Sequence, residues 1–224
     1  MINISDLSKH FGDKQVLKNI NIDFERGKVY GIVGENGAGK TTLFRCIAGL
    51  EKYDGQITSE LNPLKNHLGL LLTEPFFFSK MTGKEYIRLL CNARNIESFN
   101  IDDKNIFDLP LHQYASTYST GMKKKLALTA ILLQENECFI LDEPFNGVDI
   151  HSNIIITGLI RKLHALGKTV LISSHIFSTL SDTCDEIFLM KNGEIVKKVA
   201  QEQFNALELE MMAFTLGDKI ERFF

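Results

Sequence analysis

The sequence predicts an α/β fold whose core is a mostly parallel sheet, with an N-terminal antiparallel β subdomain and a small α-helical subdomain. Strand and helix patterns alternate through most of the chain, which is typical of a parallel sheet covered by helices. The segments 2–4 and 20–24 instead place apolar residues at every second position, the period of half-buried antiparallel strands. The 224 residues are 44% hydrophobic, enough for the core of one large domain or two small ones.

The first element of the predicted parallel sheet is a continuous apolar run over 29–33. Such a run is typical of a strand that is buried on both faces. Glycines in 34–39 interrupt the run, and a helical pattern follows over 40–50. The order is therefore strand, glycine-rich loop and helix.

Later elements are bounded by recognisable end signals. Thr82 and Glu85 have the spacing of a capping box, which opens a helix through about residue 94. Gly167 suits the C-cap of a helix over 150–166, and Asn192-Gly193 is a strong two-residue hairpin signal. The remaining predicted elements are strands over 68–72, 138–141 and 169–173 and a helix over 121–134.

The glycine-rich loop carries a phosphate-binding motif. Gly34–Thr41 fits G-x-x-x-x-G-K-[ST] at every fixed position, between a buried strand and a helix. Backbone N–H groups of such a loop surround a phosphate, and the helix N-terminus adds the positive end of its dipole. Lys40 is expected to neutralise the β and γ phosphates, and the Thr41 hydroxyl to bind Mg²⁺. The motif predicts a P-loop NTPase core, with Gly34, Asn36, Gly37, Ala38, Gly39, Lys40, Thr41 and Thr42 as candidate phosphate-binding residues.

Two acidic residues follow the predicted strand over 138–141. Asp142 is expected to orient Mg²⁺ or its waters from a rigid strand end. Glu143 lies one residue further and is expected to polarise the attacking water as the general base. Acidic residues also end strands at ordinary turns, so the phosphate loop is what favours the catalytic interpretation.

The segment Tyr118–Leu126 separates this chain from other proteins with a phosphate loop. It resembles the signature of the ATP-binding-cassette (ABC) ATPases, whose family form is Leu-Ser-Gly-Gly-Gln, often with Met in place of Gln in the most similar subgroup. Ser119 and Gly121 match, and Met122 takes the last position. The resemblance implies that these three residues complete the nucleotide site of a second subunit. Ser119 also suits the N-cap of the following helix.

The resemblance to ABC ATPases extends over nearly the whole chain. Phe11 matches the aromatic residue that stacks on adenine, and Val16 its apolar companion. Asp149, at the end of Asn146-Gly147-Val148-Asp149, matches the D-loop and is implied to lie at the dimer seam. Ser173-Ser174-His175 resembles the switch-histidine element, which implies that His175 reaches the γ phosphate.

Two positions depart from the family pattern. Thr73 stands where a glutamine normally contacts Mg²⁺ and links the site to the membrane partner. Threonine is shorter, so a water-mediated contact from Thr73 or Glu74 and altered coupling are expected. Thr120 replaces the first signature glycine and places a β-branched side chain where close approach to phosphate is needed. We expect weaker dimer closure from this replacement.

The resemblance implies a single ABC ATPase domain over 1–224, with an ATP-binding core over 1–72 and 136–224 and a helical subdomain over 73–135. It implies ATP and Mg²⁺ as ligands, a homodimer closed across ATP, and a transmembrane permease subunit on a separate chain. The implied function is ATP hydrolysis that powers transport, as in stand-alone ABC-2-type exporter subunits. The alternatives are a soluble ABC-type ATPase without a membrane partner and a weakly hydrolysing, nucleotide-responsive binding module.

Composition and charge argue against several other classes. The chain has 25 Lys and Arg against 28 Asp and Glu, so no positive field favours nucleic acid as a partner. The apolar run over 29–34 is far shorter than the ~20 residues that span a bilayer, and no export signal is expected. Four single cysteines suit reduced thiols, which predicts a cytoplasmic protein, peripheral on the cytoplasmic face of the membrane. Lys123–Lys125 are expected to form a solvated helix face.

Overall fold

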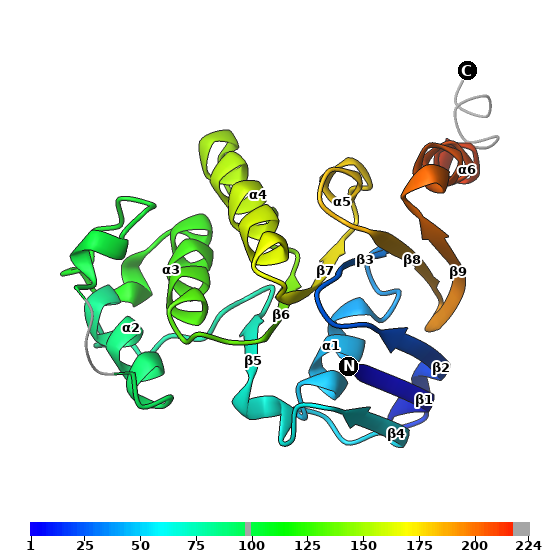
Figure 1. The fold of residues 1–224 in the computed structure, drawn as a ribbon, viewed down its shortest axis with the longest axis horizontal. Coiled ribbons are helices and arrows are strands. Elements are labelled where there is room, and N and C mark those ends of the chain that lie inside the picture. Colours follow the sequence, from blue (N-terminus) through cyan, green and yellow to red (C-terminus); the bar gives the residue numbers. More distant parts are fainter. Residues whose placement is uncertain (97–99, 217–224) are drawn as a thin grey trace.

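A computed structural model describes residues 1–96 and 100–216 of the chain (Figure 1). Residues 97–99, within the predicted helical subdomain, and residues 217–224 lie outside this description. A smaller sheet and helix α1 (Lys40–Ile47) share a core with one face of a larger sheet. The other face of the larger sheet carries the helices α3 to α6.

The larger sheet has six strands in the order β5-β6-β7-β3-β8-β9. Neighbouring strands are parallel, except that β9 is antiparallel to β8. The strands are β3 (Val29–Val33), β5 (Leu68–Leu71), β6 (Cys138–Asp142), β7 (Thr169–Ser174), β8 (Glu186–Lys191) and β9 (Glu194–Ala200). All residues of β3, β6 and β7 are buried, as their apolar runs predict. The predicted α/β fold class is confirmed.

The smaller sheet is antiparallel, in the order β2-β1-β4. Its strands are β1 (Ile2–Phe11), β2 (Lys14–Phe24) and β4 (Asp54–Ser59). Alternating apolar residues predict the first two strands. The third was not predicted, because its only large apolar residue is Ile57 and the strand shows no period of two. It pairs with β1 at the edge of the sheet, where polar residues are tolerated.

The helices lie close to their predicted positions. Helix α1 ends at Ile47 rather than Leu50, because Gly49 has a φ of +73°, a left-handed conformation that ends helices. The predicted capping box is confirmed: Thr82 Oγ1 accepts the Glu85 N–H at 3.2 Å, and the Glu85 carboxylate accepts the Thr82 N–H at 2.8 Å. The other helices are α2 (Gly83–Asn92), α3 (Thr120–Leu132), α4 (Ile150–Ala165), α5 (Ser178–Ser181) and α6 (Phe204–Leu216). Short 3₁₀ turns span Leu64–Asn66, Asp102–Lys104, Ala115–Thr117 and Gln201–Gln203.

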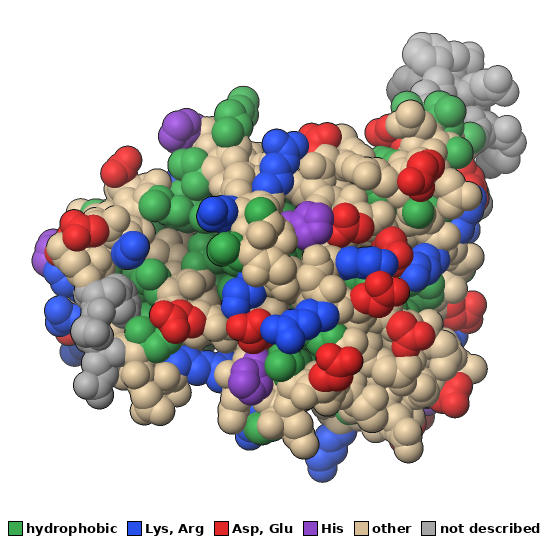
Figure 2. All heavy atoms as spheres, in the orientation of Figure 1, with side chains coloured by type: hydrophobic (Ala, Val, Ile, Leu, Met, Phe, Trp, Pro, Cys, Tyr) green, Lys and Arg blue, Asp and Glu red, His purple; other side chains and the backbone are tan. Residues whose placement is uncertain are grey.

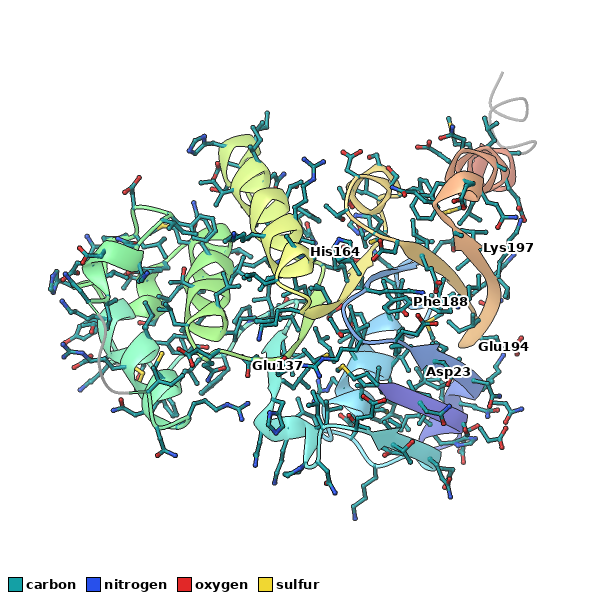
Figure 3. The ribbon with its side chains drawn as sticks, viewed as in Figure 1. Asp23, Glu137, His164, Phe188, Glu194 and Lys197 are labelled. Atoms are coloured by element: carbon teal, nitrogen blue, oxygen red, sulfur yellow. The ribbon has the colours of Figure 1, made fainter. Side chains whose placement is uncertain are left out.

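An aromatic cluster joins the two sheets beside β3. The ring of Phe24 lies 5.0 Å from that of Tyr30 and 5.7 Å from that of Phe188, both edge to face. Phe188 extends from β8 (Figure 3), and Lys198 Nζ lies 5.5 Å from its ring centroid. Such aromatic pairs contribute about 0.5–1.5 kcal/mol each beyond the burial of their area. The cluster therefore anchors β3, whose end carries the phosphate loop.

The expectation of a solvated face at Lys123–Lys125 is wrong for two of the three lysines. Lys123 is partly exposed, but Lys124 is only 1% exposed. The Lys125 side chain is 13% exposed and pairs with Asp149 at 3.2 Å. Successive helical residues point about 100° apart, so three consecutive lysines cannot share one face.

The exposed surface mixes charges of both signs. On the face shown in Figure 2, acidic and basic side chains lie next to one another over the sheet half of the molecule. Glu137, for example, pairs with Lys168 at 2.6 Å and with Arg26 at 3.1 Å. Within 1–96 and 100–216, no helix combines the length and the apolar composition that crossing a bilayer demands.

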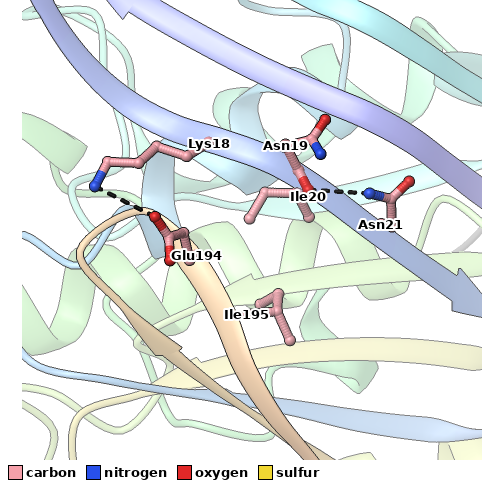
Figure 4. A pocket seen from close by; sticks show the side chains of 6 residues that line it. All are labelled: Lys18, Asn19, Ile20, Asn21, Glu194 and Ile195. Atoms are coloured by element: carbon pink, nitrogen blue, oxygen red, sulfur yellow. Dashed lines mark hydrogen bonds and ion pairs between the residues drawn. The ribbon is translucent and has the colours of Figure 1, made fainter.

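A pocket of about 420 Å³ lies between β2 and β9, the facing edges of the two sheets (Figure 4). Lys18 and Glu194 pair across it at 3.5 Å, and both side chains are more than one third exposed. The Lys18 N–H donates to the carbonyl oxygen of Gly193 at 2.9 Å, which holds the β8–β9 hairpin against β2. No residue of the phosphate loop lines this pocket, so it is distinct from the candidate site.

Candidate functional site

The loop over 34–39 connects β3 to α1 and has positions that favour glycine. A Cβ atom at Gly34 would lie 2.3 Å from a backbone oxygen of β8. Gly39 has a φ of +111°, which residues with side chains rarely adopt. The carbonyl oxygen of Ala38 accepts the Gly193 N–H at 3.0 Å, so the β8–β9 hairpin supports the loop. Asn36 and Gly37 remain exposed at its tip.

Lys40 begins α1, and its side chain folds back into the loop. Its ammonium group donates to the carbonyl oxygens of Gly34 at 2.7 Å and Glu35 at 3.3 Å. The same Nζ atom lies 3.4 Å from Glu143 Oε1, and Lys40 is only 6% exposed. The positive charge is therefore held at the N-terminus of a helix, where backbone N–H groups also favour an anion. Thr41 is exposed beside it, and Thr42 is partly buried.

Three hydroxyl groups converge on the Asp142 carboxylate at the end of β6. Thr41 and Thr73 both donate to Asp142 Oδ2, at 2.7 and 2.5 Å. Ser173, on β7, donates to Asp142 Oδ1 at 2.6 Å. Asp142 is fully buried, so these bonds compensate for the hydration that its charge loses. Glu74, the alternative to Thr73 in the sequence, is exposed.

Each polar group of Glu143 has a partner. Its N–H donates to Ser173 Oγ at 2.9 Å, and its carbonyl oxygen accepts a bond from Lys124 Nζ at 2.7 Å. Its Oε2 atom lies 2.9 Å from His175 Nδ1, and its Oε1 atom has the ion-pair contact with Lys40. Glu143 itself has a φ of +50°, a left-handed conformation that is uncommon for a residue with a side chain. The carboxylate is thus aimed from a tightly held backbone.

The residues expected at the adenine lie on the two neighbouring strands β1 and β2 of the smaller sheet. Phe11, the last residue of β1, is 48% exposed, and Lys9 Nζ lies 4.5 Å from its ring centroid. Val16 is partly buried on β2. Its carbonyl oxygen packs closely against Gly193 and Gly39, so Val16 lies next to the phosphate loop. The exposed ring of Phe11 offers a flat surface to a base.

The signature residues occupy the N-terminus of α3. Ser119 is exposed and caps the helix, since its hydroxyl accepts the Met122 N–H at 3.2 Å. A Cβ atom at Gly121 would lie 2.6 Å from the carbonyl oxygen of Gly147, so α3 packs directly on the predicted D-loop. Within the described residues, no hydrogen bond or ion pair joins Ser119 to the phosphate loop of the same chain.

Asp149 caps the next helix, α4. Its carboxylate accepts the Ser152 N–H at 2.9 Å and the Ser152 hydroxyl at 2.8 Å, and it pairs with Lys125. These hydrogen bonds from Ser152, and then the charge of Lys125, lower the pKa of Asp149. Its side chain is 58% exposed, so it remains accessible to another molecule.

The structure therefore brings together one group of predicted residues and leaves two others apart from it. Lys40, Thr41, Thr73, Asp142, Glu143 and His175 form one bonded cluster. Val16 lies next to the loop and Phe11 ends the neighbouring strand β1, whereas the signature and Asp149 lie at the N-termini of α3 and α4. The sequence did not single out Ser173 or Lys124 as partners of Glu143. The run of three consecutive lysines is the sequence signal for a buried lysine, because three successive residues of a helix cannot all face the solvent.

The donor set around Asp142 suits a magnesium ion. Mg²⁺ prefers oxygen ligands and usually combines one or two carboxylates with waters and substrate phosphates. The Thr41 and Thr73 hydroxyls give their hydrogens to Asp142, which leaves their lone pairs available to a cation. In the part of the chain that the structure describes, no group of three or more His, Cys, Asp and Glu side chains could hold a metal. A cation here would depend on these hydroxyls, Asp142 and the phosphates.

The chain is similar to several known proteins. A family model described as ABC transporter matches residues 17–146. The bacitracin transport ATP-binding protein BcrA of Enterococcus faecalis is 32% identical over 231 residues, covering 97% of this chain and 75% of that protein. The ABC transporter ATP-binding protein NatA of Bacillus subtilis (strain 168) is 32% identical, and the alignment covers 90% of this chain and 90% of that protein. The dimeric ATP-binding cassette MJ0796, solved in a post-hydrolysis state with ADP and Pi, has the same fold, with a TM-score of 0.81. The two chains are 19% identical, and the match covers 90% of this chain and 99% of that one.

Proposed function

Because the chain belongs to the ABC transporter family, we propose that Lys40, Asp142 and Glu143 bind and hydrolyse magnesium-bound ATP at a dimer seam on the cytoplasmic face of a membrane. The chain is the ATP-binding and hydrolysing subunit of a transporter and works with a separate permease subunit.

The observation that carries the proposal is the environment of Glu143. Its carboxylate lies between Lys40 of the phosphate loop and His175, and its backbone N–H is held by Ser173. A general base needs to be fixed within hydrogen-bond reach of the proton that it takes. With the γ phosphate at the loop, Glu143 is placed to orient and deprotonate the attacking water, and His175 to contact the phosphate beside it.

We assign Thr41, Thr73 and Asp142 as the residues that hold Mg²⁺ or its waters. Asp142 accepts both threonine hydroxyls on one oxygen, so the three groups form one rigid unit. The ion would neutralise charge on the β and γ phosphates during phosphoryl transfer. Gly34, Asn36, Gly37, Ala38, Gly39, Lys40 and Thr42 complete the phosphate site.

The exposed residues are proposed to meet the nucleotide from two sides. Phe11 would stack on the adenine, with Val16 beneath the base. Ser119, Gly121 and Met122 would bind the γ phosphate of the nucleotide held by a second copy, and Asp149 would lie at the seam. An isologous dimer then closes two sites at once.

We further propose one ABC ATPase domain, with 73–135 as a helical subdomain that contacts the permease and 1–72 with 136–224 as the ATP-binding core. The Met-Lys-Lys-Lys form of the signature supports an exporter of the ABC-2 kind. Bacitracin transport by a relative is consistent with that class.

Steady-state phosphate release from ATP tests the proposal. Release is expected with Mg²⁺ and is expected to stop with excess EDTA. Nucleotide binding without release in either condition would favour the nucleotide-responsive module. Co-fractionation with a hydrophobic partner in detergent-solubilised membranes separates a transporter subunit from a soluble ATPase.

Thr73→Val is expected to raise the Mg²⁺ concentration for half-maximal hydrolysis about tenfold. Removing a hydrogen-bond partner of a metal ligand usually lowers metal affinity by at least that factor. Valine keeps the shape of threonine but removes the bond to Asp142 Oδ2. The measurement is hydrolysis against Mg²⁺ concentration at saturating ATP. Thr117→Val is the control, because the Thr117 hydroxyl bonds only locally to Tyr114. An unshifted curve for Thr73→Val would remove Thr73 from the metal site.

Thr120→Gly is expected to lower the ATP concentration for half-maximal dimerisation about fivefold, which corresponds to ~1 kcal/mol. Thr120 is the exposed first residue of α3, next to Ser119 of the signature, so its β-branched side chain would hinder close approach of a partner's phosphate. The same change weakens the helix by up to about 1 kcal/mol. Tighter dimerisation, measured by light scattering, should therefore accompany a slightly lower melting temperature. An unchanged ATP dependence contradicts the prediction.

A further inference from the structure

Lys124 is a charged residue in the core of the protein. It lies in the second turn of α3 and is 1% exposed. Its ammonium group donates to the carbonyl oxygens of Glu143 at 2.7 Å and Asn146 at 2.8 Å. Burial lowers the pKa of Lys124, while the charges of Glu143 and Asp142 oppose that shift. A lysine is rarely buried this deeply unless fixed partners hold its ammonium group.

The two carbonyl groups belong to one tight turn that directs the Glu143 carboxylate. The Asn146 N–H donates to the Glu143 carbonyl oxygen at 3.2 Å, which closes the turn. Glu143 opens it with a φ of +50°, a conformation that persists only where the surroundings enforce it. Lys124 bridges both ends of this turn and so enforces it. On the other side of Glu143, Ser173 accepts its N–H.

The helix that carries Lys124 also carries the signature. Ser119 caps α3 five residues earlier, about 7.5 Å along the helix axis. Figure 1 shows α3 beside α4, the helix that follows the 143–149 segment. At Gly121, α3 contacts the backbone of Gly147 closely, with no room for a side chain. A displacement of α3 therefore moves the Lys124 ammonium together with the turn that it holds.

We propose that Lys124 is a positioning residue for hydrolysis, which fixes the turn over 143–146 and transmits the position of the signature helix to Glu143. The inference rests on the proposed function. In the dimer, Ser119 acts on the nucleotide of the partner, whereas Glu143 acts on the nucleotide of its own chain. Lys124 then links the two sites, because the turn that directs Glu143 is bonded to the helix whose N-terminus contacts the partner's phosphate.

The first test is Lys124→Met, which keeps the length of the stem and removes the ammonium group. We expect kcat for ATP hydrolysis to fall about 30- to 100-fold, the scale of an ångström-sized misplacement of a catalytic group. The KM for ATP should stay within about threefold, because Lys124 contacts neither the phosphate loop nor Asp142. Lys123→Met is the matched control, since the Lys123 side chain makes no hydrogen bond or ion pair within the described residues.

A double variant separates positioning from a general loss of structure. Lys124 acts through Glu143 in this proposal, so adding Lys124→Met to Glu143→Gln should lower the remaining rate by less than about twofold. If Lys124 served folding alone, Lys124→Met would lower the rate of the Glu143→Gln variant by the same factor by which it lowers the wild-type rate. Multiplicative losses therefore overturn the proposal.

The remaining outcomes also decide between the alternatives. A kcat for Lys124→Met equal to that for Lys123→Met overturns the positioning role but leaves the proposed function intact. Failure of the proposed function itself would appear as a Glu143→Gln variant that hydrolyses ATP like the wild type. If Lys124→Met does not fold, Lys124→Gln carries the test, because its amide is one bond shorter and uncharged. A wild-type kcat from that variant overturns the proposal equally.

Discussion

Glu143→Gln is expected to lower steady-state ATP hydrolysis by about 10²- to 10⁴-fold, the usual contribution of a positioned general base. The amide keeps the size of the carboxylate but cannot take a proton from water at neutral pH. Lys40 and His175, which contact the two carboxylate oxygens, remain in place to meet the phosphates. ATP affinity should therefore change little, and phosphate release under saturating ATP is the direct measurement.

The same variant should accumulate as an ATP-bound dimer, because hydrolysis no longer removes the γ phosphate that joins the two copies. Light scattering with Mg²⁺ and ATP should then show a doubled mass, and addition of EDTA should return the monomer. Glu135→Gln, an exposed acidic residue in the turn before β6, is the control and should hydrolyse ATP normally. A Glu143→Gln variant that stays monomeric at saturating ATP contradicts ATP-driven closure by the isolated chain.

The parts of the site that could be predicted from the sequence are contiguous in it. The phosphate loop is recognisable because glycines, Lys40 and Thr41 must follow a buried strand at fixed spacing. The loop forms as predicted, and its glycines have the conformations and close contacts that explain them. Asp142 was predicted for a similar reason, since it ends a short apolar run whose strand is fully buried.

Contacts between distant segments could not be predicted in this way. Thr41 and Asp142 are 101 positions apart, and the Ser173 hydroxyl that bridges Asp142 and Glu143 comes from a third element. Which side chains meet depends on the order β6-β7-β3 in the sheet, which places the three strand ends side by side. Strand β4 was missed for a different reason, because a polar edge strand leaves no apolar period to detect.

Lys40→Met is expected to raise the dissociation constant for magnesium-bound ATP about 100-fold, or ~2.7 kcal/mol. The methionine side chain fills most of the same volume but removes the charge and the donors that lie within the loop. Hydrogen bonds between a charged donor and phosphate are about twice as strong as neutral ones, and the low exposure of Lys40 limits screening by water. Equilibrium binding of ATP measures the change, with Lys123→Met as the control that should bind normally.

Loss of the Lys40 charge should also weaken the protein without nucleotide, because Lys40 is the ion-pair partner of Glu143 Oε1. That oxygen is buried and accepts no hydrogen bond within the described part of the chain. Leaving it unpaired should lower the free energy of unfolding by about 1–3 kcal/mol. The double variant Lys40→Met with Glu143→Gln removes the unpaired charge and should regain part of that stability, but no ATP affinity. Equal stability of the single and double variants in thermal unfolding would mean that the pair contributes nothing, and that Lys40 is held in the loop by its backbone contacts alone.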